Sequence, residues 1–299
     1  MSFHWDDVRF FLEITRAGSQ LAAARRMGVS HTTVARHIAR LQTDLGAELF
    51  ERGAEGLGLT ETGQEILSLA QRMEDLGTAL ADRSAAIGGA VSGRLRIGAP
   101  DGVGNSFLSR HLPGLRDQQP GLEIEYVPVP RAHKLWRRDV DISIALDRPR
   151  TGRIVCRKLV DYDLRLYGSR ETLNRVGHPL SRQDLRGFDF VGYVDDLLYA
   201  EALDFNAEVE DGLRVPYRAA TVQAQLDAVL AGRSLGVLPC FMADAAGLVP
   251  VMPSEIGFER SYWLLIPEDI RDQSRVRVAA EYLVRLFRDH TKGFRFAGR

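Results

Sequence analysis

Three short segments at the start of the chain carry apolar residues at helical spacing. Residues 5–15 predict a first helix, whose apolar face is formed by Val8, Phe11, Leu12 and Ile14. Residues 20–27 predict a short Ala-rich helix, and residues 31–45 predict a third helix that Ser30 caps. Because Gly28 leaves only a tight turn between the last two, this pair predicts a helix-turn-helix.

The pattern then changes to a glycine-rich stretch followed by a long amphipathic helix. Residues 52–59 are too few and too flexible for another helix and suit a two-stranded wing. From residue 61 to about 88, apolar residues fall mostly at steps of three and four, at Ile66, Leu69, Met73, Leu76, Leu80 and Ile87. Such a seam predicts pairing with a second copy of the helix. The alternative is packing on its own domain, but a span of roughly 40 Å is long for one small core.

Strands and helices alternate from the glycine-rich break at residues 88–93 to the end of the chain. Strands are expected at 95–97, 123–127, 140–145, 164–167, 190–193, 235–238 and 262–266, and helices at 106–116, 222–230 and 274–288. This order predicts the α/β class, with mixed sheets. A chain of 299 residues is also long enough for two or more separately cored domains.

The charge and cysteine content of the chain narrow its class and location. The 39 basic and 40 acidic residues nearly cancel, so any nucleic-acid contact must be local. Cys156 and Cys240 show no disulfide framework, which favours a reducing cytoplasm over the alternative of a redox-sensing role. The first residues lack the basic-then-apolar order of a signal peptide, and no run approaches the roughly 20 apolar residues of a membrane helix. We therefore expect a cytoplasmic protein with no membrane contact.

The third helix carries the residues that can read DNA. In a helix-turn-helix, the exposed N-terminal residues of the second helix face base edges, here His31, Thr32, Thr33 and Arg36. The Ser30 hydroxyl can serve a phosphate as well as its own helix. Residues 1–60 hold seven basic and seven acidic residues, so charge alone does not distinguish DNA binding from a small helical interaction module.

The run FFLEITRAGSQLAAARRMGVSHTTVARHIARLQTDLGAELFER, followed by LTETGQEIL, resembles the signature of LysR-type transcription regulators. The resemblance implies a bacterial regulator that binds operator DNA through Ser30–Arg40, including His37 and Arg40. It also implies that Arg52 of the wing lies against the DNA backbone or minor groove. The chain departs from the usual family residues at His31, Ala35, Gln42 and Glu55. These departures concern the bases read and the affinity rather than the class.

The remainder, residues 93–290, more loosely resembles a periplasmic-binding-protein-like effector domain with two α/β lobes and a cleft between them. The implied domains are a winged helix-turn-helix over 1–60, a dimerising linker helix over 61–89 and an effector domain over 93–299. Lobe I would comprise 93–161 with 268–290, and lobe II 162–267. The resemblance further implies dimers that assemble into tetramers, and a small-molecule effector as a partner beside double-stranded DNA.

The resemblance also implies effector contacts at two helix starts that face each other across the cleft. The loop after the first strand would lead into a helix whose free N–H groups suit a small polar or anionic ligand, with Asn105 and Ser106 as side-chain partners. Thr221 and Gln223 open the facing helix, where the alternative role of Thr221 is capping. Asp101 would repel a carboxylate nearby, unless it only caps a turn and points to water.

Two other functions compete with regulation. Residues 232–236, GRSLG, match the G-x-S-x-G pattern of a serine hydrolase, but that elbow needs a strand before Ser234 and a helix after it, the reverse of the order expected here. A free-standing solute-binding protein would use the two-lobed domain alone, which the helix-turn-helix argues against. The seven histidines show no metal-ligand spacing with either cysteine. We therefore expect a regulator that is not an enzyme and needs neither metal nor cofactor.

Overall fold

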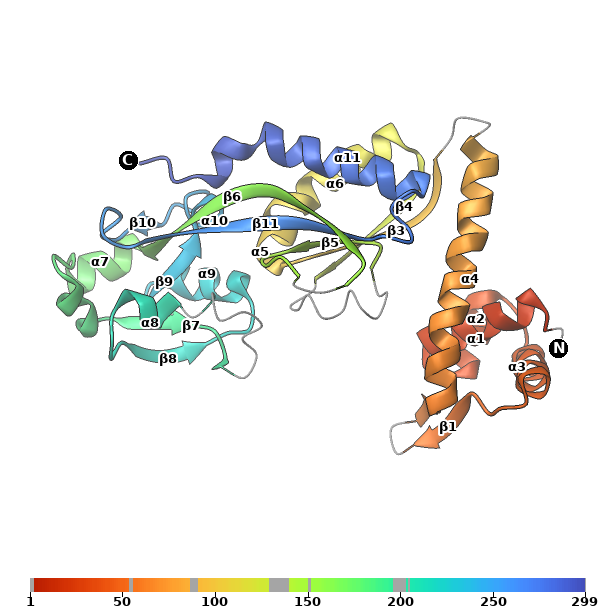
Figure 1. Ribbon diagram of the computed structural model, residues 1–299. Helices are drawn as coiled ribbons and strands as arrows, with labels where there is room; N and C mark the ends of the chain where they lie inside the picture. The colour runs from red at the N-terminus through yellow and green to blue at the C-terminus, as the bar shows by residue number, and fades with distance from the viewer. Residues whose placement is uncertain are drawn as a thin grey trace. The chain divides into compact units, whose positions relative to one another are not determined.

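The computed structural model describes residues 3–53, 56–86, 91–128, 140–149, 152–195, 203 and 205–298. The chain divides into two compact units, Met1–Ser84 and Ala85–Arg299 (Figure 1). Each unit has an apolar core of its own.

The first unit is a three-helix cluster with a two-stranded wing. Its helices are α1 (Trp5–Ala17), α2 (Gln20–Met27) and α3 (His31–Leu45), and its wing pairs β1 (Phe50–Gly53) antiparallel with β2 (Gly56–Leu59). Gly28 ends α2 at φ +67°, a left-handed conformation that L side chains rarely adopt. The core between the helices holds Phe11, Leu12, Ile14, Val34, Leu41 and Leu49. The predicted helix-turn-helix and wing are therefore confirmed.

Helix α4 (Glu61–Ala86) presents two different faces. Near its start, Ala70 is buried and Ile66 packs against the core of the first unit. The leucines that stay exposed, by 52%, 71% and 75%, are Leu69, Leu76 and Leu80. The predicted seam is thus divided, because Ile66 serves the unit's own core while the three leucines face solvent. Ile87, the last residue of the predicted seam, lies outside the described residues.

The described part of the second unit is built on one mixed sheet of nine strands. Their order is β4 (Gly121–Pro128), β3 (Ser92–Ala99), β5 (Ile142–Ala145), β11 (Gly257–Pro267), β6 (Ile154–Gly168), β9 (Leu235–Pro239), β7 (Asp189–Gly192) and β8 (Arg214–Arg218), with β10 (Val249–Pro250) paired to β6. The pairs β3–β4, β3–β5, β7–β8 and β7–β9 are parallel, as expected for α/β units.

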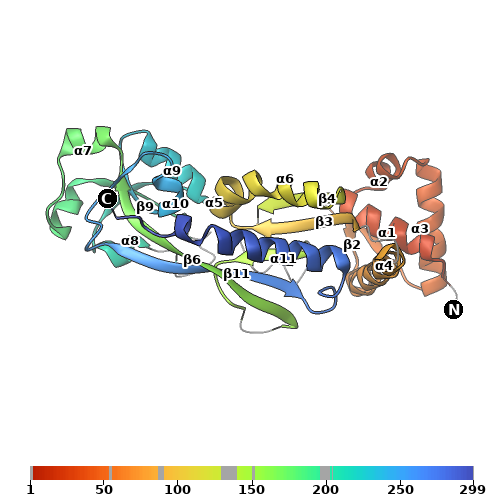
Figure 2. The ribbon, with the colours of Figure 1, turned by 90° about the horizontal axis from the view of Figure 1, so that it is seen from above.

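Two long central strands connect the two halves of this sheet. Strands β6 and β11 pair antiparallel from Ile154 opposite Pro267 to Arg165 opposite Gly257. Strand β5 joins one end of this pair and β9 the other, so a lobe forms at each end (Figures 1 and 2). We call the lobe with β3–β5 lobe I and the lobe with β7–β9 lobe II. The sequence predicted only one end of each long strand, because exposed charged residues break the apolar alternation elsewhere, at Arg157, Lys158 and Glu259.

Helices pack on both lobes. Lobe I carries α5 (Asp101–Val103), a π-helical turn (Gly104–Leu108), α6 (Ser109–Gln118) and α11 (Ser274–Asp289). Lobe II carries α7 (Arg170–Val176), α8 (Phe205–Val209), α9 (Val222–Leu230) and α10 (Cys240–Ala243), and 3-10 turns lie at Arg182–Gly187 and Thr291–Phe294. Within the ranges that the structure describes, no helix combines the length and hydropathy that a membrane crossing requires.

The helix after β3 begins earlier than the sequence predicted. It starts at Asp101, whereas the expected start was residue 106, so the loop predicted there is wrong. Gly102 and Gly104 disguise this start, because glycine is a poor helix former and usually marks a turn.

Candidate nucleic-acid interface and ligand cleft

The first turn of α3 is held by its own capping residue. The Ser30 Oγ accepts a hydrogen bond from the Thr33 backbone N–H at 3.1 Å and lies 2.7 Å and 2.8 Å from the hydroxyls of Thr32 and Thr33. His31, Thr32 and Arg36 are exposed, and Thr33 is half-buried. These residues therefore share one ordered helix start that faces solvent, which is the geometry that enters a major groove.

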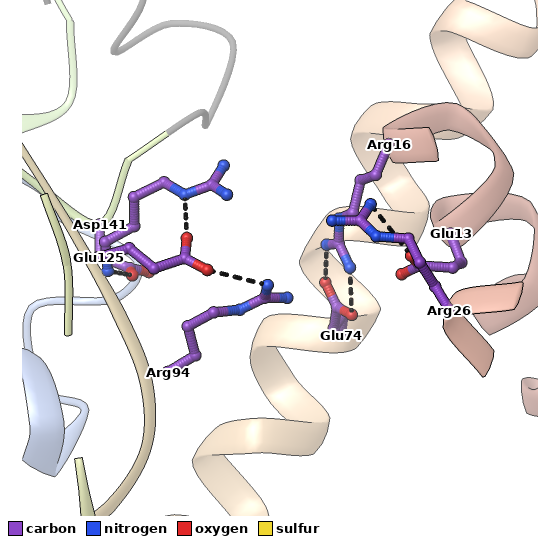
Figure 3. Close-up of polar contacts among 8 residues, drawn as sticks. Glu13, Arg16, Arg26, Glu74, Arg94, Glu125 and Asp141 are labelled. Atoms are coloured by element: carbon purple, nitrogen blue, oxygen red, sulfur yellow. Dashed lines mark hydrogen bonds and ion pairs between the residues drawn. The ribbon is translucent and has the colours of Figure 1, made fainter. Parts of the chain in front are cut away.

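Several arginines of the first unit are neutralised by nearby acids. The pairs are Arg9 with Asp6, Arg16 with Glu74 and Arg26 with Glu13, of which Figure 3 shows the last two. Of the arginine side chains that the structure describes in this unit, Arg25, Arg36 and Arg72 are exposed and pair with no acid. The even count of charges in the sequence therefore hides three available cations. Two of them, Arg25 and Arg36, lie on α2 and α3, the elements that meet DNA in a helix-turn-helix.

His37 and Arg40 of α3 are fastened to a buried acid on α1. The Asp7 carboxylate accepts hydrogen bonds from Arg40 Nε at 2.7 Å and Nη2 at 2.5 Å and lies 2.5 Å from His37 Nδ1. The His37 ring also stacks on Phe10 at 4.0 Å. Burial raises the pKa of Asp7, but the hydrogen bonds and charges of Arg40 and His37 outweigh it, so this pKa lies below its ordinary value. Both predicted DNA contacts thus also fix α3 against α1.

Gln42 ties α3 to the entry of the wing. Its Oε1 accepts the Leu49 backbone N–H at 3.0 Å, and its Nε2 donates to Glu48 at 2.7 Å. A glutamate at this position would instead place its carboxylate beside that of Glu48. In the wing, Arg52 lies opposite Leu57 in the β1–β2 register, and its side chain lies outside the described part of the chain.

A cavity lies between the two lobes of the second unit. It measures about 360 Å³ with its open mouth included. The described residues that line it are Pro100, Asp101, Gly102, Leu146, Tyr162, Leu164, Tyr193, Leu203, Phe205, Val222, Val237, Pro239 and Tyr262. Both lobes and both central strands contribute, and the lining is largely apolar. Clefts between lobes with apolar and aromatic walls and a few polar groups are common positions for ligand sites in proteins.

Asp101 joins the two lobes beside this cavity. Its Oδ2 accepts the Gln223 backbone N–H at 3.0 Å, so an acid at the start of α5 caps the start of α9. Figure 2 shows α5 next to α9. Burial raises the pKa of Asp101, although hydrogen bonds from backbone N–H groups, including those of Gln223 and Val222, oppose the rise. Asp101 thus caps a helix, as one alternative held, but the helix belongs to the facing lobe.

The expected side-chain contacts Asn105 and Ser106 are absent from the described lining of the cavity. Because the helix begins at Asp101, Asn105 and Ser106 lie in its second turn, where Asn105 is exposed and Ser106 half-buried. Neither residue therefore lies at the helix start where the prediction placed it.

The facing helix start uses Thr221 and Gln223 in different ways. Thr221 is exposed and its Oγ1 accepts the Ala224 backbone N–H at 3.3 Å, which is the capping role. Gln223 gives its backbone N–H to Asp101 and its side-chain amide to Asp227, at 3.2 Å. Of the five predicted effector contacts, the structure brings Asp101 and Gln223 together.

Sequence reasoning missed the aromatic side chains of the cleft. The rings of Tyr162 and Tyr262 stack at a centroid distance of 4.3 Å, next to a register shift between Tyr262 and Trp263. Tyr193 and Phe205 line the same cavity from lobe II. No sequence pattern joins these positions, because only the pairing of β6 with β11 and the return of the chain through lobe II bring them together.

Other reactive groups of the second unit are buried or half-buried. Ser234 of the GRSLG run lies buried after α9 and before β9, the reverse of a nucleophile elbow. Burial raises the pKa of the Cys240 thiol to about 11 and also raises that of Cys156, so both favour the unreactive protonated form. Over the same described ranges, no cluster of three or more His, Cys, Asp or Glu side chains is placed to hold a metal ion.

Two family models match the chain. The one described as "Bacterial regulatory helix-turn-helix protein, lysR family" matches residues 5–64, and the one described as "LysR substrate binding domain" matches residues 88–288, about two thirds of the chain. The chain belongs to the LysR family. It is a LysR-type transcriptional regulator with a helix-turn-helix DNA-binding domain and an effector-binding domain.

Relatives of this LysR-type regulator match nearly its whole length. The "Mau operon transcriptional activator" of Paracoccus denitrificans is 26% identical over 97% of this chain and 99% of its own. The "HTH-type transcriptional activator TtdR" of Escherichia coli is 25% identical over 93% and 91%. Among solved structures, CrgA of Neisseria meningitidis aligns at TM-score 0.60 and 23% identity over 94% and 98% of the two chains. Full-length CbnR complexed with its target DNA aligns at TM-score 0.59 and 20% identity over 97% and 99%.

Proposed function

We propose that this regulator binds its operator through the start of α3 and the wing. The observation that carries the proposal is the exposed first turn of α3, where Ser30 orders two threonine hydroxyls and Arg36 pairs with no described acid. His31–Thr33 face base edges, while Arg36 and Arg52 contact guanine or phosphate. Full-length CbnR, which shares the fold, has been solved with its target DNA.

Three other side chains of the head position it on the duplex. His37 and Arg40 hold α3 on Asp7, and the Arg40 side chain, 44% exposed, also reaches a phosphate. Arg25 stands exposed in the last turn of α2. Because the first helix of a helix-turn-helix crosses the DNA backbone, Arg25 contacts phosphate there.

Helix α4 joins two copies of the chain. Leu69, Leu76 and Leu80 form an apolar stripe at steps of seven and four residues, and they are exposed in the single chain. A parallel or antiparallel copy of the same helix buries such a stripe. The homodimer then assembles into the homotetramer that the family resemblance implies.

The cleft takes a small-molecule effector, and the effector changes operator binding. A ligand has this effect only if it binds one arrangement of the lobes better than another. The hydrogen bond from Gln223 to Asp101 is the contact between lobes that such a ligand alters. The regulator acts in the cytoplasm, where its operator lies, and performs no catalysis.

Operator binding tests the DNA part of this proposal. In fluorescence anisotropy with the upstream intergenic DNA of its own gene, Arg36→Ala should weaken binding about tenfold and lower the salt slope by about one, because it removes one cation from the interface. Arg72→Ala, an exposed arginine on α4, is the matched control and should leave both unchanged. Equal behaviour of the two variants contradicts the proposal.

A further inference from the structure

The start of α9 is already occupied by a carboxylate of the chain itself. The first N–H groups of a helix have no partner within it and carry the positive end of its dipole. At α9, the Gln223 backbone N–H donates to Asp101 Oδ2 at 3.0 Å. The backbone N–H groups of Val222, Asp101 and Gly102 also favour the charged form of this carboxylate. Asp101 therefore uses the donors that an anionic ligand would need.

Glycine lets the two helix starts approach this closely. A Cβ on Gly102 would lie 2.6 Å from Cγ1 of Val222 and 3.1 Å from Sδ of Met242. Any side chain at this position would push α5 away from α9 and separate Asp101 from Gln223. The glycine and the acid before it thus close this end of the cavity together.

The rest of the described lining offers no cation to an anionic ligand. None of the described residues that line the cavity is Lys, Arg or His. Arg260 lies over the Phe205 ring at 5.3 Å, but its guanidinium is bonded to Glu208 at 3.2 Å. The stacked rings of Tyr162 and Tyr262 complete a wall that is aromatic and aliphatic.

We propose that the Asp101 carboxylate itself occupies the position at the start of α9 where an anionic ligand would bind. The cleft therefore takes an uncharged, apolar or aromatic effector and rejects carboxylates. This inference rests on the proposed function, because it assigns the ligand class of the same cleft. A carboxylate in the cavity would face Asp101 with no described lining cation to offset the repulsion. An uncharged ring meets no such repulsion and gains from burial against the aromatic wall. The Asp101 carboxylate already accepts the Gln223 N–H, so an ammonium would have to compete with the start of α9 for it.

Three probes of one shape test the ligand class. Benzamide, benzoate and benzamidine are neutral, anionic and cationic at pH 7 and otherwise nearly isosteric. With full-length protein and no DNA, benzamide should raise Tm in a dose-dependent way, and the two charged probes should not. A shift from benzoate or benzamidine as large as that from benzamide overturns the proposal.

Chemical rescue tests whether the Asp101 carboxylate fills this position at the start of α9. Asp101→Ala keeps the Cβ of the side chain, so formate supplies the missing carboxylate. Formate should raise Tm of this variant saturably over chloride at equal ionic strength, and benzoate should bind it at least tenfold more tightly than it binds the wild type. The wild type and Asp117→Ala, which alters an exposed acid of α6, should respond to neither.

A second variant keeps the test decisive if Asp101→Ala folds poorly. Asp101→Asn preserves the shape of the side chain but removes its charge, so it should bind benzoate more tightly than the wild type does and show no formate response. Unchanged benzoate binding in both variants, with no formate response in Asp101→Ala, overturns the proposal. These readouts need no DNA, so their failure is distinct from a failure of operator binding in the Arg36→Ala experiment.

Discussion

The Asp7 carboxylate on α1 accepts two hydrogen bonds from the Arg40 guanidinium on α3, at 2.7 Å and 2.5 Å. Asp7 is fully buried, whereas the Arg40 side chain is 44% exposed. One long side chain therefore runs from a core acid to the surface of the recognition helix. The placement of that helix depends on the charge of a single buried carboxylate.

Asp7→Asn should destabilise the first unit by about 2 kcal/mol, because it removes charge-assisted hydrogen bonds to a buried acceptor. Asp6→Asn is the matched control, since Asp6 is exposed and its ion-pair partner among the described residues is the exposed Arg9, and it should cost under about 0.5 kcal/mol. Hydrogen exchange of peptides from α1 and α3 measures both, because it reports the opening of this unit alone. Equal protection in the two variants would show that the Asp7 contacts contribute nothing to stability.

The lowered pKa of Asp7 determines how its contribution to the stability of the first unit changes with pH. Burial raises the pKa of Asp7, but the hydrogen bonds and charges of Arg40 and His37 outweigh it and hold the pKa of the folded chain below its ordinary value of about 4. A lowered carboxyl pKa contributes stability above the ordinary value, and this contribution is lost as pH falls through the folded pKa. The advantage of the wild type over Asp7→Asn should therefore shrink from pH 5 to pH 3. An advantage that grows over this range contradicts the account.

Leu76→Asp should raise the dissociation constant of the dimer at least a hundredfold, because it places a charge in the apolar stripe that the second α4 covers. Ser68→Asp is the matched control, since Ser68 is exposed on the same helix away from the stripe. Light scattering measures the molar mass of both. A Leu76→Asp variant with the mass of the wild type would assign α4 to packing within one chain.

Tyr126 and Tyr282 should respond in opposite directions to the same change. The Tyr126 hydroxyl is buried and has no hydrogen-bond partner among the described residues, whereas the Tyr282 hydroxyl donates to the His111 carbonyl at 2.5 Å. Tyr126→Phe should therefore stabilise the second unit by about 1 kcal/mol, and Tyr282→Phe should destabilise it by about 1 kcal/mol. Tm measures both, and equal losses in the two variants contradict the account.

The sequence predicted the helices of the first unit because local signals mark their ends. The hydroxyls of Ser19 and Ser30 cap α2 and α3 as expected, by accepting the backbone N–H groups of Ala22 and Thr33. At Asp101 the local signal misled, since the glycines after it indicate a turn and hide the helix start. Asp101, the first residue of this helix, accepts a hydrogen bond from Gln223, which lies more than a hundred residues later in the sequence.

The position of the cleft between the lobes was predicted, but the chemistry of the side chains that line it was not. The lobes follow from the family resemblance and the helix start at Thr221 from the local pattern, whereas the stack of Tyr162 on Tyr262 follows only from the β6–β11 register. A local pattern carries no information about such a register. In the sequence, the helix starts therefore indicated a polar or anionic ligand while Asp101 argued against a carboxylate, and the contact of Asp101 with Gln223 favours an uncharged ligand.

The ratio of affinities for the operator and for random DNA of equal length tests the central claim most directly. The wild type should bind the upstream intergenic DNA of its own gene about a thousandfold more tightly than random DNA. Thr33→Ala should reduce that ratio about tenfold or more while leaving the affinity for random DNA unchanged, because Thr33 reads bases and not phosphates. Equal wild-type affinities for the two DNAs, or equal losses on both in Thr33→Ala, would contradict the assignment of the start of α3 as the base-reading surface.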